Sequence, residues 1–247
     1  MKMVNIQCRL QGFIVHLHSL KKQSFTAYKN LSKVFHCSTH LQIASCIKFT
    51  WFNSGILHVH DSITHQKAHM ILSDTSILNA IERNDIVIEP YQRSCLGTNS
   101  YDVHLSKFLA CYTDDVIDAK MHNRVHHFEI PEDGIVLQPG KTYLGSTVEY
   151  TETRQYVPFL EGKSSVGRLG IDIHATAGKG DVGFCNHWTL EISVSQSVRV
   201  YAEMPIGQLI YFTVDGEVEV DYSSKTSAKY NDRSPHPVES MMWKNSF

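Results

Sequence analysis

The sequence predicts a mainly β fold, a sandwich or a barrel of short strands, for the chain from residue 70 onward. Several short segments alternate apolar and polar residues, as half-buried strands do, and turns with glycine or proline separate them. Helical periodicity is confined to the start of this region and to a few residues near position 166. Many short strands with few helices are typical of sandwiches and barrels.

The first expected element is a short helix over residues 70–84. Ser73 or Asp74 is suited to cap its N-terminus, and Ile77, Leu78 and Ile81 fall on one face. We expect this apolar face to pack against the β structure.

The strands follow at short intervals. Pro139-Gly140 predicts a type II turn, because glycine accepts the positive φ of the third position. Residues 114–133 are aperiodic, which indicates a surface loop containing one strand. The polar tail, residues 222–247, is interpreted as a flap that closes over a ligand. The expected strands are 86–88, 101–109, one before the 139–140 turn, 143–148, 188–194, 198–201, 206–214 and 218–220.

Charge divides the chain into two regions. Residues 1–69 carry eight Lys or Arg and one acid, a net charge of +7, whereas residues 70–247 carry 15 basic and 24 acidic residues, a net charge of −9. We interpret residues 1–69 as an N-terminal extension outside the domain, either disordered or translated from an over-extended reading frame whose true start is Met70. The domain is residues 70–247, and its acidity opposes nucleic-acid binding.

Histidines and cysteines give no strong metal signal. His58, His60, His65 and His69 have a spacing that suits zinc or nickel, but without a supporting fold we interpret the cluster as chance. The six cysteines show no paired spacing, which argues against a disulfide framework and a zinc ribbon. No apolar run approaches the length of a membrane span, and no signal peptide is evident. We expect a cytoplasmic protein without a membrane partner.

Residues 161–191 contain the candidate site. The loop Gly162–Arg168 places two hydroxyls and two cations within a few residues, a composition that suits an anion. The alternative is structural, since Ser164 and Ser165 are also suited to cap a short helix over residues 166–169.

Two carboxylates follow this loop. Asp181 lies in a glycine-dense turn. Glu191 shares its strand parity with Thr189 and Ser193 and not with its apolar neighbours, so it faces either a pocket or solvent. In the structural alternative, Glu191 forms a weak surface pair with Arg168.

The motifs of this stretch resemble those of the deoxycytidine triphosphate (dCTP) deaminase family, including its members that are also dUTP diphosphatases. The resemblance is carried by GKSSVGRLG, HATAG, Asp181 and TLE, and extends in order through MILSD, NSYDVHLS, LQPGKTYLGSTVEY, IGQL and AKY. It covers nearly all of residues 70–247 and none of residues 1–69. It implies a distorted β-barrel of the dUTPase-like type, assembled as a homotrimer with active sites at subunit boundaries.

The resemblance implies hydrolytic deamination of dCTP to dUTP and ammonia. Zinc deaminases carry a C-x-x-C ligand pair that this chain lacks, so a metal-free mechanism without zinc is expected. By resemblance Glu191 is the general acid and base, the Ser164 hydroxyl and the Ala177 carbonyl hold the water, and Arg168 polarises the site.

The resemblance also implies the substrate contacts. Lys163, Ser165 and Arg168 are expected to line the triphosphate, and Mg²⁺ is expected to bind together with the triphosphate. Asp181 is expected at the deoxyribose. The other expected binding residues are Val166, Gly167, Thr189, Leu190, Gln208, Tyr222, Lys229 and Arg233. Partners implied are dCTP and the feedback inhibitor dTTP.

Three readings follow. The first is a deaminase that releases dUTP; the second is a bifunctional enzyme that continues to dUMP and pyrophosphate; the third is a non-catalytic nucleotide-binding regulator, because fold does not settle function. The family commonly has Ile-Asp-Pro-Gly where this chain has Gly-Asp-Val-Gly at residues 180–183, which is expected to loosen the turn around Asp181.

Overall fold

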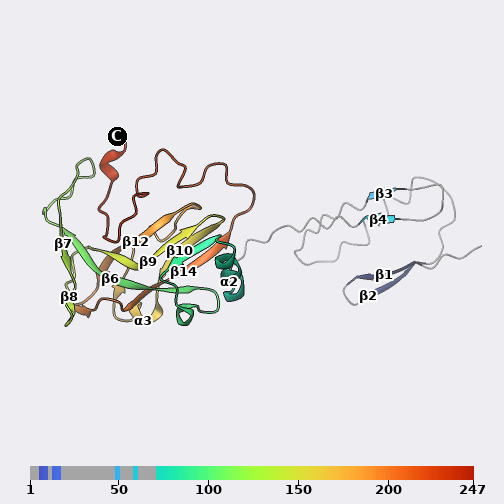
Figure 1. Cartoon of the computed structure of the whole chain (residues 1–247), viewed down its shortest axis with the longest axis horizontal. Helices are drawn as coiled ribbons and strands as arrows, with labels where there is room; N and C mark the ends of the chain where they lie inside the picture. The colour runs from blue at the N-terminus through green and yellow to red at the C-terminus, as the bar shows by residue number, and fades with distance from the viewer. Residues whose placement is uncertain (1–5, 11–12, 18–47, 51–57, 61–70) are drawn as a thin grey trace, which may run out of the picture. The chain divides into compact units, whose positions relative to one another are not determined.

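The computed structural model describes residues 6–10, 13–17, 48–50, 58–60 and 71–247, and the chain divides into two units, residues 1–65 and 66–247 (Figure 1). In the first unit, β1 (Ile6–Leu10) pairs antiparallel with β2 (Phe13–Leu17), and β3 (Lys48–Thr50) pairs with β4 (His58–His60). The remaining residues of the predicted extension, with His65 and His69, lie outside the described residues.

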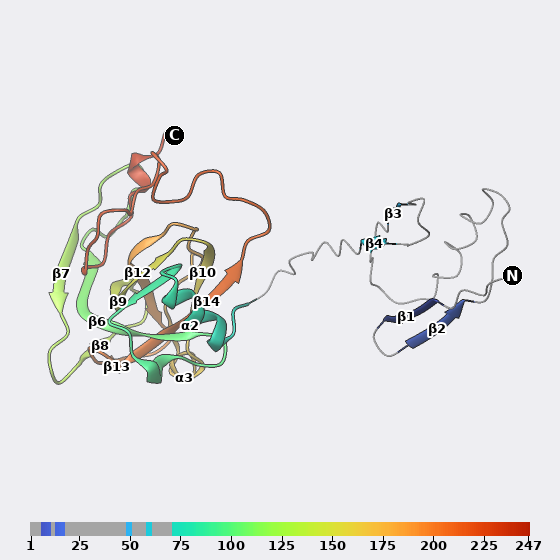
Figure 2. The same ribbon diagram turned by 45° about the vertical axis from the view of Figure 1, so that its right-hand side comes forward.

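The second unit is mainly β and barrel-like, as predicted (Figures 1 and 2). A central sheet has the strand order β10-β14-β6-β9-β12-β11, with β5 on β9 and β7 on β6, and a separate pair joins β13 to β8. The elements are α2 (Asp74–Glu82), β5 (Ile86–Glu89), η2 (Arg93–Cys95), β6 (Tyr101–Tyr112), β7 (Val125–Glu129), β8 (Ile135–Leu137), β9 (Tyr143–Thr153), β10 (Tyr156–Gly162), α3 (Ser164–Gly167), β11 (Ile171–Asp172), β12 (Cys185–Val194), β13 (Val198–Val200), β14 (Pro205–Thr213) and η3 (Met242–Lys244).

Helix α2 confirms the predicted N-terminal helix. Ser73 is the N-cap, and its side chain accepts a hydrogen bond from the amide of Ser76 at 3.3 Å. Ile77 and Ala80 are buried, so the helix packs its apolar face onto one end of the barrel (Figure 1). Burial of an aliphatic side chain of this kind stabilises the fold by about 1.5–3 kcal/mol.

Alternation along β12 decides which side chains reach the core. Trp188, Leu190 and Ile192 are buried in the core, with Leu190 and Ile192 at 0% exposure. Because successive side chains of a strand point to opposite faces, Thr189 and Glu191 lie on the other side of the sheet.

The structure confirms the turn predicted at residues 139–140 but not the strand predicted at residues 218–220. Gly140 has φ of 78°, which confirms the positive φ expected in the Pro-Gly turn. The strand predicted at residues 218–220 is wrong, because β14 ends at Thr213 and the chain then turns. Val218 and Val220 are half exposed and line a small surface hollow together with Val157 on β10.

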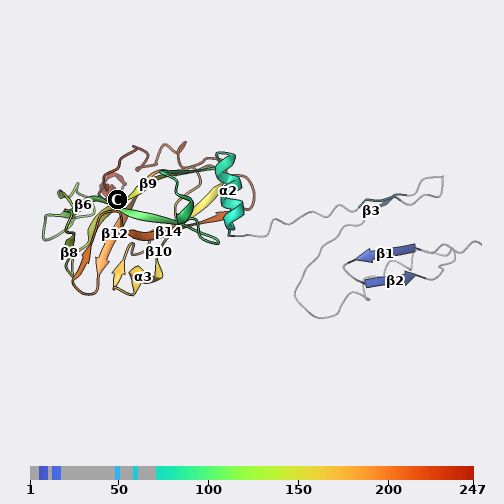
Figure 3. The same cartoon turned by 60° about the horizontal axis from the view of Figure 1, so that its bottom comes forward.

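The tail after residue 222 crosses one side of the barrel, on the side opposite α3 in all three ribbon views (Figures 1 to 3). Asn186 on β12 donates from Nδ2 to the carbonyls of Tyr230 and Asp232, at 3.0 and 2.9 Å, and accepts from the amide of Ser234 at 3.0 Å. Val238 N donates to the Thr189 hydroxyl at 3.0 Å. These bonds hold the irregular tail against β12.

We expect Asn186→Ala to release this part of the tail. Asn186 is 3% exposed, and its three bonds to the tail, at about 0.5–1.5 kcal/mol each, have no replacement in alanine. Trypsin cleaves only the detached tail, and the variant is expected to populate that state more. We therefore expect cleavage after Lys229 and Arg233 to be about tenfold faster than in the unmodified chain. Asn99→Ala, on an exposed turn, is the control, and equal cleavage rates in both variants would contradict the tethering role.

Candidate active site

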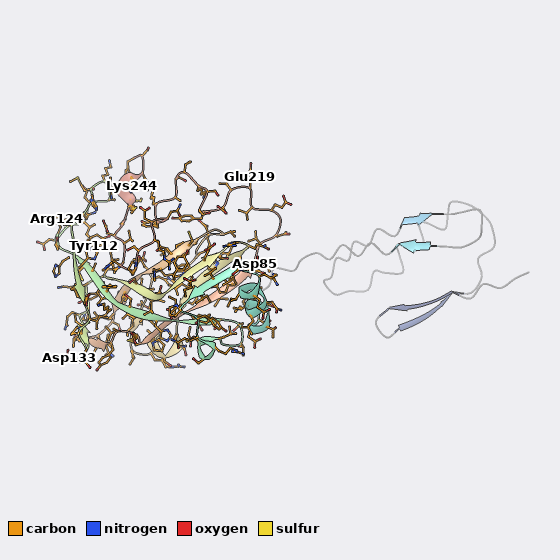
Figure 4. The ribbon with its side chains drawn as sticks, in the orientation of Figure 1. Asp85, Tyr112, Arg124, Asp133, Glu219 and Lys244 are labelled. Carbon is orange, nitrogen blue, oxygen red and sulfur yellow. The ribbon has the colours of Figure 1, made fainter. Side chains whose placement is uncertain are left out.

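A cavity of about 600 Å³ lies between β12, the turn at residues 175–184 and the tail. Its lining is mixed, with two carboxylates, several aromatic rings, hydroxyls and one amide. Tyr112, labelled in Figure 4, lies at the end of β6 where its hydroxyl accepts a hydrogen bond from the amide of Ser240 at 3.0 Å. The lining residues are Tyr112, Thr142, Leu144, Ala175, Ala177, Lys179, Gly180, Asp181, Phe184, Asn186, His187, Trp188, Thr189, Glu191, Ser193, Tyr222, Tyr230, Val238 and Ser240.

Glu191 faces this cavity and not bulk solvent, which decides between the two orientations left open by its parity. Its backbone amide donates to the carbonyl of Ile173 at 2.9 Å, and its Oε2 accepts from the amide of Ala175 at 3.4 Å. The segment after β11 therefore runs beside β12 and brings Ala175 and Ala177 to the carboxylate. A carboxylate held by a backbone amide keeps a fixed orientation toward a ligand.

The turn that carries Asp181 is packed closely against β10. The amide of Leu160 donates to Gly178 at 2.7 Å, and the amide of Gly180 donates to Pro158 at 2.8 Å. A Cβ on Gly180 would stand 2.8 Å from both the Pro158 ring and the Trp188 ring. A side chain at position 180 would therefore collide with both rings, so the turn is packed tightly at Gly180.

Of the three binding residues predicted in the C-terminal tail, one lines the cavity and two do not. Tyr222 lines the cavity, and its hydroxyl accepts from the amide of Tyr230 at 3.3 Å. The Lys229 ammonium binds the Asn245 side chain. Arg233 stacks on Tyr150 at 3.9 Å. Neither Lys229 nor Arg233 is among the residues that line the cavity in the described part of the chain.

The anion loop is not brought to Glu191 within one chain. Ser164, Ser165, Gly167 and Arg168 are exposed, around α3, and do not line the cavity. Helix α3 and the tail lie on opposite sides of the barrel (Figure 3), and no residue from 162 to 168 is among the cavity-lining residues of the described chain.

The loop has a local polar neighbourhood. Lys163 forms an ion pair with Asp102, and Gln208 pairs in register with Glu161 on β10. Ser100 Oγ donates to Gln208 Oε1 at 3.3 Å. Gln208 is thus beside the loop and not in the cavity, so the predicted site residues form two groups.

The structural alternatives for the loop are not observed. The N-cap of α3 is Lys163, without a side-chain capping hydrogen bond, so neither serine caps the helix. Arg168 and Glu191 form no ion pair with each other.

Two of the residues that are expected to bind substrate have side chains in the core. The side chains of Val166 and Leu190 are buried in the core, at 4% and 0% exposure. The alternation of β12 directs Leu190 inward, so only the backbone groups of these residues are available to a ligand.

Sequence reasoning missed several lining residues. His187 has the same parity as Glu191, a signal that was available in the alternation of β12. Its Nδ1 lies 3.1 Å from the Thr147 carbonyl, and burial lowers the pKa of its imidazole below the ordinary value. Tyr112 and Tyr230 reach the cavity from distant segments, for which no local pattern exists.

In the part of the chain that the structure describes, no group of three or more His, Cys, Asp or Glu side chains is arranged to hold a metal ion. Asp181 offers one carboxylate in the cavity, and its Oδ1 binds Lys179. A single carboxylate fits a Mg²⁺ ion that is held mainly by phosphate oxygens and water. No described helix is long and apolar enough to cross a membrane.

Fold and cavity together define a barrel-like β protein with an acidic, aromatic-lined cavity that its C-terminal tail borders on one side. A family model described as dCTP deaminase-like matches residues 71–214. The chain belongs to the dCTP deaminase-like family, which confirms the resemblance found in its motifs.

Individual relatives are similar over most of their length. The dCTP deaminase, dUMP-forming, of Clostridium acetobutylicum is 46% identical over 177 residues, covering 71% of this chain and 98% of that protein. The protein of the same name from Leptospira biflexa is 48% identical over 159 residues, covering 64% of this chain and 91% of that protein. A crystal structure of 2'-deoxycytidine 5'-triphosphate deaminase from Agrobacterium tumefaciens matches with a TM-score of 0.49 and 20% identity, covering 59% of this chain and 49% of that one.

Proposed function

We propose that this protein converts dCTP and two water molecules to dUMP, ammonia and pyrophosphate. Of the readings that the sequence left open, the relatives named dUMP-forming favour the bifunctional one over a deaminase that releases dUTP. The observation that carries the proposal is the presence of two separate carboxylates, Glu191 and Asp181, in one cavity.

Deamination is assigned to Glu191. In this step water adds to C4 of the cytosine ring, and Glu191 takes its proton and delivers it to the ring nitrogen. Glu191 then takes the proton of the new hydroxyl at C4 and delivers it to the amine, the C4 carbonyl forms, the bond between C4 and the exocyclic nitrogen breaks, and ammonia leaves. The Ala177 carbonyl lies in the same cavity and accepts a hydrogen bond from the water. One carboxylate is sufficient for both transfers when it stays within hydrogen-bond reach.

Formation of dUMP is assigned to the side of the cavity that carries Asp181. Water attacks the α-phosphorus, the bond to the oxygen that bridges to the β-phosphate breaks, and pyrophosphate leaves with the bonding electrons. Asp181 accepts the proton of the attacking water. Mg²⁺, when bound with the phosphates, neutralises charge that develops on their oxygens.

We further propose that the anion loop of a neighbouring copy completes each cavity in a homotrimer. Lys163, Ser164, Ser165, Arg168 and Gln208 lie away from the cavity of their own chain. A triphosphate needs more positive charge than the described lining provides, and this loop carries two cations. Contribution of the loop by a second copy brings the two groups of predicted residues together, with Ser164 beside the attacking water.

The test is product analysis with the full chain. We expect dCTP with Mg²⁺ to give dUMP, with ammonia and pyrophosphate released in equal amounts and no build-up of dUTP. Chromatography of the nucleotides and separate assays of ammonia and pyrophosphate measure this. Accumulation of dUTP without pyrophosphate would support the monofunctional reading, and tight dCTP binding without turnover would support the non-catalytic regulator.

A further inference from the structure

Lys179 is the one lysine or arginine among the cavity-lining residues in the described part of the chain. The other charged lining residues are Asp181 and Glu191, and burial favours neutral His187 by lowering its pKa. From the cavity's own chain, an anionic ligand therefore meets two carboxylates and a single cation. Neither motif matching nor the substrate contacts expected from the sequence included this lysine.

The backbone of Lys179 is fixed by its neighbours. Lys179 forms a β-bridge with Phe159 on β10, between the hydrogen bonds made by Gly178 and Gly180. A Cβ at Gly178 would stand 2.6 Å from the Leu160 carbonyl oxygen, so both flanking positions are pressed against other atoms. In such an extended segment residues two apart share a face, which places the side chain of Lys179 on the same side as that of Asp181.

The two side chains form an ion pair. Lys179 Nζ lies 2.5 Å from Asp181 Oδ1, with the side chains 52% and 45% exposed. An exposed pair of this kind contributes little to stability, so the pairing alone does not account for the lysine. The ammonium has three donors and no acceptor, so one bond to Asp181 leaves two for phosphate oxygens.

We propose that Lys179 is a substrate-contacting residue of the dUMP-forming step. Its ammonium binds an oxygen of the phosphate nearest the deoxyribose while it holds the Asp181 carboxylate toward the attacking water. As the bond between the α-phosphorus and the bridging oxygen breaks, the ammonium stabilises the negative charge on the phosphate oxygens. Deamination occurs on the base, at the other end of the nucleotide, and does not need this charge. This inference rests on the proposed bifunctional reaction.

The experiment compares Lys179→Met, Lys179→Arg and the matched control Lys107→Met in the full chain. Lys107 is also 52% exposed and forms an ion pair at 3.0 Å with an exposed acid, Glu129, on the barrel surface outside the cavity. Initial rates of pyrophosphate release from dUTP and of ammonia release from dCTP are measured separately, each with its kcat and KM.

We expect Lys179→Met to lower kcat for pyrophosphate release about 10²-fold, the loss typical of removing one charge-stabilising donor. Its kcat for ammonia release is expected to stay within about threefold, so that dUTP accumulates from dCTP. Lys179→Arg keeps the positive charge and is expected to restore most of the pyrophosphate release, and Lys107→Met is expected to match the unmodified chain.

Two results would overturn the inference. Unchanged pyrophosphate release in Lys179→Met would remove Lys179 from the step, and an equal fall in both activities would assign it a general binding or structural role. Failure of the proposed function looks different, because the unmodified chain would then release ammonia without pyrophosphate, or neither product.

Discussion

Glu191→Gln is expected to lower ammonia release from dCTP by at least about 10²–10⁴-fold, because glutamine neither accepts the proton of the attacking water nor delivers it to the leaving amine. The fold is expected to remain intact, since the side-chain oxygen of glutamine still accepts the hydrogen bond that the Ala175 amide donates to Glu191. The rate of ammonia release at saturating dCTP measures the loss, and equilibrium binding of dCTP shows that the cavity is preserved.

Glu129→Gln, an exposed glutamate on β7 outside the cavity, is the matched control and is expected to leave the rate unchanged. Pyrophosphate release from dUTP is a second measurement on the Glu191→Gln variant. Because that step is assigned to the other carboxylate of the cavity, we expect it to fall much less. Full ammonia release by Glu191→Gln would remove Glu191 from the chemistry.

The orientation of Glu191 shows how far the sequence alone leads. Alternation along β12 indicates that Thr189, Glu191 and Ser193 share a face but leaves open whether it meets a pocket or solvent, and in the structure this face lines a cavity. The N-cap of α2 at Ser73 could also be predicted from the sequence. Strand alternation and helix capping both depend on residues that are only a few positions apart. Such local patterns are the strongest signals in a single sequence.

The sequence contains no comparable pattern that predicts contacts between distant segments. Tyr112 and Tyr230 enter the cavity from β6 and from the tail, and the tail is fixed by hydrogen bonds from Asn186 rather than by any periodicity of its own. The sequence Gly-Asp-Val-Gly at residues 180–183 was expected to loosen its turn, and only the rings of Pro158 and Trp188 beside Gly180 show why glycine fits there. The position of Lys179 in the cavity likewise depends on contacts with a distant segment, β10, and not on a local pattern.

The loop around α3 requires more than one chain to interpret. Its motif predicts contact with a triphosphate, yet in a single chain Ser164 and Arg168 are exposed and do not line the cavity that holds Glu191. A sequence specifies which residues form a site but not which copy supplies each of them. The proposed trimer resolves this separation and makes a quantitative prediction.

Arg168→Ala and Glu191→Gln are each expected to be nearly inactive as pure proteins and to regain activity when their chains are mixed within one assembly. If every site takes its loop from one chain and its cavity from a neighbour, each trimer that contains both chains has one site with an intact loop and an intact cavity, so roughly a third of the sites in the doubly purified sample are active. The chains carry different affinity tags, are co-expressed and are purified over both tags before ammonia release is measured.

A mixture of Arg168→Ala with Ser164→Ala is the matched control, because both lesions lie in the same loop and no combination of these chains supplies an intact one. It is expected to remain inactive. If instead each site used the loop and the cavity of its own chain, every chain in the first mixture would carry one lesion in its own site, and mixing would restore nothing. Activity in the first mixture and none in the second would therefore require that the exposed loop of one copy reaches the Glu191 cavity of another.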